Sequence, residues 1–239
     1  MKLDILAMGA HPDDVELSCS GVLMKAIEEG KKVGILDFTR GELGTRGTPE
    51  IRLAESIAAT QVMGIHVREN LEIADGFFEN SKENQLKIIQ IIRLYQPDIV
   101  ISNALNDRHP DHGKGAKLAY DASFLSGLRM IETLDKNKKV QIAWRPQKVI
   151  HYIQDRYLEP DFVVDITPYW EKKVEAIKAF KSQFFDPSST EPESYISKPG
   201  FLEFIEARAM EMGHKIGVKY GEGFQSEFTL SIKSLDNIL

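Results

Sequence analysis

Short apolar runs alternate along this chain with longer segments in which apolar residues recur at helical spacing. The runs are too short for buried helices and are typical of strands covered on both faces. One predicted helix begins at Pro49 and ends near Gly64, residue types that favour a helix start and a helix end. The strands predicted in the first half are residues 3–8, 32–38, 71–73 and 98–102. The helices predicted there are residues 15–29, 49–64, 83–95 and 112–122.

The second half continues the pattern, with strands predicted at 149–154 and 162–166 and helices at 169–181 and 200–212. Residues 186–199 are rich in Ser, Pro and Glu, and we expect a long loop of the kind that often serves as a lid or an interface element. The alternation predicts βαβ units, and therefore an α/β fold with a parallel sheet covered on both faces. No repeat or linker divides the sequence, so we predict a single domain spanning residues 1–239.

Composition and charge narrow the class of protein. Hydrophobic residues make up 42% of the chain and charged residues 28%, ordinary values for a globular protein. The formal net charge of -6 argues against nucleic acid, whose binders usually carry a concentrated basic face. Cys19 is the one cysteine and cannot form an intramolecular disulfide, which fits a reducing cytosol. No signal peptide and no apolar stretch of ~20 residues is recognisable, so we expect a cytoplasmic protein that does not bind a membrane.

The sharpest motif, Gly9 to Glu16, lies where the first strand ends and the first helix begins, the place where open α/β sheets bind ligands. His11 and Asp14 are three residues apart on a tight turn, and an imidazole with a carboxylate is a typical start of a zinc site. Asp13 must point differently and could act as a general base. The alternative is that both aspartates merely cap the helix. A G-x-G-x-x-G signature is absent, which weakens a dinucleotide-binding interpretation.

A second polar cluster, Asn106 to His112, follows the strand at 98–102. His112 would complete a site of three protein ligands with His11 and Asp14, leaving a fourth position for water as in catalytic zinc sites. His109 is then near enough to polarise a substrate carbonyl or to protonate a leaving amine. The alternative is a solvated polar loop in which the histidines are helix caps.

A third feature is the polar loop at 39–52, which carries Arg40, Arg46 and Arg52. Guanidinium groups beside the metal could hold carboxylates or hydroxyls, so the loop could bind a polyol or an acid. A flexible surface loop explains Arg46 equally well. It explains Arg52 less well, because that residue lies one helical turn after Pro49.

These motifs resemble the LmbE/PIG-L family of zinc-dependent N-acetylglucosaminyl deacetylases. The resemblance rests on Ala10 to Glu16 and on His109 to His112, and the segments 39–52 and 70–76 are also similar. It implies a Rossmann-like three-layer sandwich with a mostly parallel sheet. It also implies Zn²⁺ as the cofactor, although the same ligands accept Fe²⁺. By motif, the zinc ligands are His11, Asp14 and His112, the general base is Asp13, the residue stabilising the tetrahedral intermediate is His109, and the sugar-holding positions are Arg52 and Asp75.

Within the family, the pattern, including Tyr220 to Phe224, is most similar to the bacillithiol biosynthesis deacetylases, which remove acetate from N-acetylglucosaminyl malate. We expect that reaction here, with zinc and protonated His109 sharing the oxyanion. On charge grounds, Arg108 is our candidate for the malate carboxylate. A chitooligosaccharide or an inositol conjugate is an alternative substrate, and a non-catalytic sugar- or metal-binding protein is an alternative class. Family members are commonly oligomers, often hexamers, so the resemblance also implies a homo-oligomer.

Overall fold

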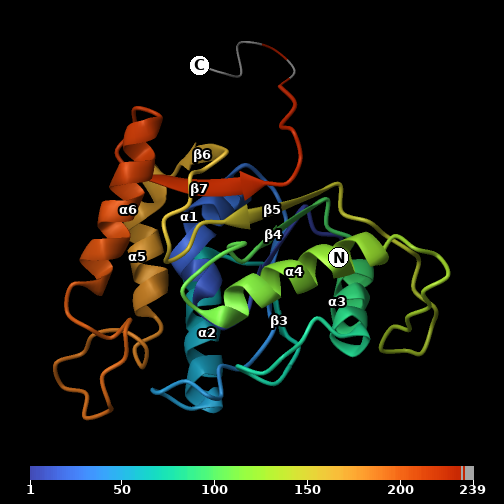
Figure 1. Cartoon of the computed structure of the whole chain (residues 1–239), viewed down its shortest axis with the longest axis horizontal. Coiled ribbons are helices and arrows are strands. Elements are labelled where there is room, and N and C mark those ends of the chain that lie inside the picture. Colours follow the sequence, from blue (N-terminus) through green and yellow to red (C-terminus); the bar gives the residue numbers. More distant parts are fainter. Residues whose placement is uncertain (233, 235–239) are drawn as a thin grey trace.

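The computed structural model describes residues 1–232 and 234, and these form one mixed sheet with helices on both faces (Figure 1). The strands are β1 (Ile5–Gly9), β2 (Val33–Asp37), β3 (Val67–Asn70), β4 (Ile99–Ser102), β5 (Lys148–Tyr152), β6 (Phe162–Asp165) and β7 (Gly221–Ser226). The helices are α1 (Asp14–Glu28), α2 (Pro49–Met63), α3 (Lys82–Tyr95), α4 (Pro110–Leu125), α5 (Trp170–Lys178) and α6 (Phe201–Lys215), with a 3-10 turn at Thr167–Tyr169.

The order of the strands in the sheet is β3-β2-β1-β4-β5-β7-β6. The first five of these strands are parallel to one another, whereas β7 runs antiparallel to both β5 and β6. The chain moves outward from β1 through β2 to β3, and then returns to place β4 on the other side of β1. Such a reversal opens a crevice at the carboxyl ends of β1 and β4, where ligands of open α/β sheets bind.

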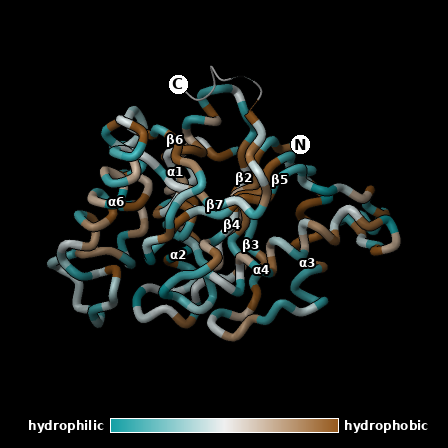
Figure 2. Tube along the Cα trace, turned by 45° about the horizontal axis from the view of Figure 1, so that its top comes forward, coloured by the Kyte–Doolittle hydropathy of each residue, from teal (hydrophilic) through white to brown (hydrophobic). Residues whose placement is uncertain are grey.

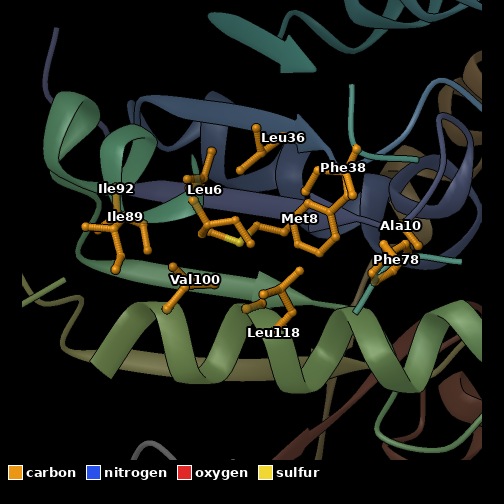
Figure 3. Close-up of a cluster of buried hydrophobic side chains, with 14 of the residues drawn as sticks. Leu6, Met8, Ala10, Leu36, Phe38, Phe78, Ile89, Ile92, Val100 and Leu118 are labelled. Carbon is orange, nitrogen blue, oxygen red and sulfur yellow. The ribbon is translucent and has the colours of Figure 1, made fainter. Parts of the chain in front are cut away.

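Alternate residues of the central strands supply the two faces of the core. Leu6 and Met8 of β1 point to one face, where they join a buried apolar cluster with Ile89 of α3 and Leu118 of α4 (Figure 3). Ala7 of β1 points to the opposite face, into a cluster that includes residues of α1 and α5. Hydrophobic residues accordingly concentrate along the central strands (Figure 2). The sheet is therefore anchored on both faces, and this holds the ends of β1 and β4 in fixed positions.

The structure confirms the predicted α/β class and mostly parallel sheet, with two local differences. The third strand is Val67–Asn70 rather than 71–73, because these residues pair with Gly34–Asp37 of β2, and the Arg68 side chain adds hydrogen bonds to Asp37. Strand β7 was not predicted, because its glycine-rich sequence, Gly221–Ser226, lacks an apolar alternation. Residues 186–199 contain neither helix nor strand, as expected. Among the described residues, no helix is both long and apolar enough to cross a membrane.

Candidate active site

A cavity of about 350 Å³ lies at the carboxyl edge of the sheet. Its floor comes from the turns after β1, β4 and β5, and its walls come from the loop after β2 and from residues of the 186–199 segment. The eight residues predicted to act in catalysis, substrate binding or metal binding all line this cavity: His11, Asp13, Asp14, Arg52, Asp75, Arg108, His109 and His112. The tertiary structure therefore brings three separate sequence motifs together.

The turn after β1 holds Asp13 in an unusual backbone conformation. Its φ angle is 109°, a region that residues other than glycine occupy at a cost of about 1–3 kcal/mol. Asp13 occupies the position before α1, but its side chain makes no capping hydrogen bond to that helix. The capping alternative is therefore wrong for Asp13. The turn instead directs its carboxylate into the cavity, where it is 5% exposed.

Asp14 lies between His11 and His112 in the cavity and contacts each of them through a different oxygen. Asp14 Oδ1 lies 3.1 Å from His112 Nε2, and Asp14 Oδ2 lies 3.7 Å from His11 Nδ1. All three side chains are buried. Two imidazole nitrogens and one carboxylate oxygen suit Zn²⁺ as three protein ligands of a catalytic site. His11, His109 and His112 also place one nitrogen each within 4.8 Å of one another, so His109 is a competing candidate ligand.

Asp75 holds His11 in place. Its Oδ1 lies 3.0 Å from His11 Nε2, and its Oδ2 accepts a hydrogen bond from the backbone N–H of Leu43. Asp111 Oδ2 lies 3.6 Å from the same His11 nitrogen. Burial alone would lower the pKa of His11, but hydrogen bonds to Asp111, Asp14 and Asp75 outweigh burial and raise the pKa. Nε2 of His11 is thus occupied, and Nδ1 is the nitrogen available to a metal. Asp75, which the resemblance assigned to the sugar, has both oxygens engaged within the protein.

Asp107 holds His112 in the same way. Its Oδ2 bonds to His112 Nδ1, and its Oδ1 accepts the backbone N–H groups of Asp155 and Arg156. Burial would lower the pKa of His112, but the charge of Asp14 and hydrogen bonds to Asp107 and Asp14 raise it to about 9. A carboxylate behind a ligating histidine fixes its tautomer and ring orientation. Asp107 lies inside the second motif, but its spacing from His112 does not by itself predict this role.

His109 caps the N-terminus of α4 and also faces the cavity. Its Nδ1 accepts the backbone N–H of Asp111 at 3.3 Å. A neutral ring that accepts at Nδ1 carries its proton on Nε2, an assignment that follows from the hydrogen-bond network. Burial and the neighbouring charges of His11 and His112 lower the pKa of His109. His109 therefore caps α4 but lines the cavity instead of a solvated loop. In this hydrogen-bond arrangement its Nε2–H is a donor beside His11 and His112, and the lowered pKa favours this neutral form over the protonated ring that we expected.

Arg52 is hydrogen-bonded to the turn that carries Asp13. Its Nη2 donates to Asp13 Oδ2 at 3.1 Å and to the carbonyl of Pro12, and its Nη1 donates to the carbonyl of Gly41. Arg52 is 4% exposed. Burial raises the pKa of Asp13 to about 7, although the charge of Arg52 acts in the opposite direction. Arg52 therefore positions Asp13 directly, beyond the sugar contact that the resemblance implies.

Replacing Gly41 by Ala is expected to destabilise the fold by disturbing Arg52. A Cβ at Gly41 would lie 2.1 Å from Arg52 Nη1, and Gly41 has a φ of 67°. The positive φ costs about 1–2 kcal/mol for a residue with a Cβ. Displacing a buried, hydrogen-bonded group lowers the free energy of unfolding by about 1–3 kcal/mol more. Denaturant unfolding measures the loss. The matched control is Gly30→Ala, because Gly30 has a φ of 82° and an added Cβ there contacts nothing within 4 Å. Equal losses in the two variants would contradict the role of Arg52.

The other cavity arginines differ in how many of their donors are engaged. Arg46 is buried and donates to Ser182 O and Ser189 Oγ, so it fastens the start of the 186–199 loop. Arg108 is 41% exposed at its side chain, its Nε lies 3.4 Å from Asp155 Oδ2, and its guanidinium lies 4.1 Å from the ring centroid of Tyr195. Among the described residues, the two Nη groups of Arg108 have no hydrogen-bond partner. Arg108 can therefore bind an added anion.

Comparison with known proteins places the site in a family. Residues 6–123, which contain all eight predicted site residues, match the family described as PIG-L: GlcNAc-PI de-N-acetylase. The structure of a conserved protein from Thermus thermophilus is 34% identical, has a TM-score of 0.84, and aligns over 97% of this chain and 98% of that one. The N,N'-diacetylchitobiose deacetylase from Pyrococcus horikoshii is 27% identical, with a TM-score of 0.77 over 92% of this chain and 82% of that one.

The same fold also carries a different reaction. The 4-carboxy-2-hydroxymuconate hydratase from Pseudomonas putida is 22% identical, with a TM-score of 0.77 over 98% of this chain and 100% of that one. At that identity the likeness concerns the fold alone. Activity must therefore be argued from the side chains of the site.

Proposed function

Because the chain belongs to the PIG-L family of deacetylases, we propose that it hydrolyses the acetamide of an N-acetylglucosamine-containing substrate with a metal ion held by His11, Asp14 and His112. The observation that carries this proposal is the position of Asp14 between His11 and His112, in the cavity that also holds the buried carboxylate of Asp13. Zn²⁺ suits the two imidazoles and the carboxylate, and Fe²⁺ is the alternative metal. A metal ion at this position supplies a Lewis acid and lowers the pKa of water toward about 7.

Asp13, His109 and Arg52 each have a separate role in this reaction. Asp13 accepts a proton from the attacking water and delivers it to the departing amine, so that acetate and a free amino sugar are formed. The Nε2–H of His109 donates a hydrogen bond to the carbonyl oxygen as negative charge develops there. Arg52 holds the Asp13 carboxylate in the cavity through its hydrogen bond to Oδ2, which leaves Oδ1 to accept the proton of the attacking water.

For the substrate we propose N-acetylglucosaminyl malate. The support is Arg108, which lines the cavity and whose Nη groups have no hydrogen-bond partner among the described residues, so that they could bind a malate carboxylate in the bidentate manner typical of arginine. The aromatic ring of Tyr195 lies against the same guanidinium and would limit its motion. The alternative substrate is a chitooligosaccharide, because a diacetylchitobiose deacetylase is among the similar structures.

Measuring the release of primary amine tests both the proposed deacetylase reaction and the proposed malate substrate. Purified zinc-loaded protein is incubated with N-acetylglucosaminyl malate, N-acetylglucosamine and diacetylchitobiose in parallel, with and without a chelator. We expect chelator-sensitive release with a strong preference for the malate conjugate. Chelator-sensitive release from the other two sugars alone would keep the deacetylase and reject the malate substrate. No release from any of the three would reject the proposed reaction.

Replacing Arg108 by Gln is expected to raise KM for the malate conjugate about 10- to 100-fold. The reason is the loss of a charge-assisted hydrogen bond, which contributes about 1.5–3 kcal/mol to binding. Activity on diacetylchitobiose, which has no carboxylate, should change little. Steady-state kinetics on both substrates measures the difference. The control is Arg156→Gln, because Arg156 bonds to Asn106 Oδ1 outside the cavity. An equal loss on both substrates would show that Arg108 does not read the carboxylate.

A further inference from the structure

Two side-chain amides hold the carboxylate of Asp14, and neither was singled out in the sequence. Gln154 Nε2 donates to Asp14 Oδ1 at 2.6 Å, and Asn103 Nδ2 donates to Asp14 Oδ2 at 3.0 Å. Asn103 comes directly after β4, and Gln154 follows two residues after β5. Because β1, β4 and β5 are adjacent in the sheet, the three carboxyl ends bring these residues together. An ionised carboxylate only accepts hydrogen bonds, so the contacting atoms of both amides are the nitrogens.

The two oxygens of Asp14 differ in how many hydrogen bonds they accept from the protein. Oδ2 accepts from Asn103 Nδ2 and from the backbone N–H of His11, each at 3.0 Å, so both of its lone pairs are used. Oδ1 accepts from Gln154 Nε2, and its remaining lone pair faces His112 Nε2 at 3.1 Å. Oδ1 is therefore the oxygen that can bind a cation beside His112.

The backbones of both residues are held by the protein. The backbone carbonyl of Asn103 lies 2.9 Å from His151 Nδ1, and the backbone carbonyl of Gln154 accepts from Arg208 of α6. The two side chains also contact each other, because Asn103 Nδ2 donates to Gln154 Oε1 at 3.4 Å. Gly115 of α4 leaves room for the Asn103 side chain, because a Cβ there would lie 3.1 Å from Asn103 Oδ1. Both amides are buried. Neutral amides can orient the carboxylate without cancelling the negative charge that a metal ion requires.

We propose that Asn103 and Gln154 are positioning residues, which we name the amide clamp, that leave Asp14 to bind the metal through Oδ1 alone. The inference rests on the proposed metal site and adds to it two residues outside the recognised motifs. Removing a residue that orients a metal ligand typically weakens metal binding about 10- to 100-fold. The clamp therefore makes a prediction about metal affinity that does not depend on turnover.

The test measures zinc affinity without substrate, by competition with a chromophoric chelator. Gln154→Met and Asn103→Leu remove one donor each at similar size, and we expect each to weaken zinc binding about 10- to 100-fold. Gly115→Ala removes no polar group but presses on Asn103, and we expect a smaller loss. The matched control is Gln183→Met, because Gln183 is also buried at the cavity but donates to Arg46 O and Ser182 Oγ. Its zinc affinity should equal that of the unaltered protein.

The crystal structure of the zinc-bound unaltered protein supplies the second readout. We expect one bond from Asp14 through Oδ1, and symmetric binding through both oxygens would overturn the inference. Unchanged zinc affinity in every folded clamp variant would also overturn it, while the proposed function would stand. An unaltered protein that binds no zinc and no iron would instead reject the proposed metal site itself.

Discussion

Replacing Asp13 by Asn is expected to lower turnover about 100- to 10,000-fold, which is the usual contribution of a general base, while zinc binding is retained. Asn keeps the size of the side chain and tolerates a positive φ angle, so the turn at 109° should survive. It cannot accept the proton of the attacking water as a carboxylate does. Amine release gives the turnover, and metal analysis of the same sample gives the zinc content.

The control for this variant is Asp135→Asn, a carboxylate that bonds only to its own turn, at the backbone N–H groups of Asn137 and Lys139. Its turnover should match that of the unaltered protein. Thermal unfolding of both variants separates a chemical loss from a structural one. Undiminished turnover in Asp13→Asn would remove Asp13 from the mechanism, and loss of zinc from that variant would make Asp13 a ligand instead.

Replacing His112 by Ala is expected to abolish stoichiometric zinc binding and turnover together. His112 Nε2 faces Asp14, and its other nitrogen is held by Asp107, so the ring is fixed in the orientation that a metal ligand needs. A site left with His11 and Asp14 has two protein ligands, fewer than the three of catalytic zinc sites. Zinc content after dialysis and amine release measure the two effects.

His109→Ala distinguishes the two candidate ligand sets. If His109 acts as a hydrogen-bond donor, this variant keeps its zinc and loses turnover. If the metal instead binds His11, His109 and His112, His109→Ala loses zinc as His112→Ala does. The exposed His214, in the last turn of α6, provides the neutral control, and His214→Ala should retain both zinc and turnover. Unchanged zinc content in His112→Ala would contradict our ligand assignment.

Several features could be predicted from the sequence because they depend on neighbours along the chain. The alternation of apolar runs and amphipathic segments indicated the α/β class and most element boundaries. His11 and Asp14 lie three residues apart on a turn that cannot separate them far, so their proximity follows from spacing alone. The placement of both motifs after strands of a parallel sheet then predicted a shared site at one edge. The homo-oligomer remains a prediction, which light scattering in solution would test.

Other features were decided by the order of the strands and by contacts between distant segments. Asp75 is 64 residues from His11 and Gln154 is 140 residues from Asp14, and nothing in their local sequence indicates those pairings. Asn103 and Gln154 look like ordinary polar residues after strands until β4 and β5 are known to adjoin β1. The sequence by itself determined which residues gather at the proposed site, because motifs are local. Only the tertiary structure decided which oxygen of Asp14 and which nitrogen of each histidine face the proposed metal position, because those orientations are set by hydrogen bonds from elsewhere in the fold.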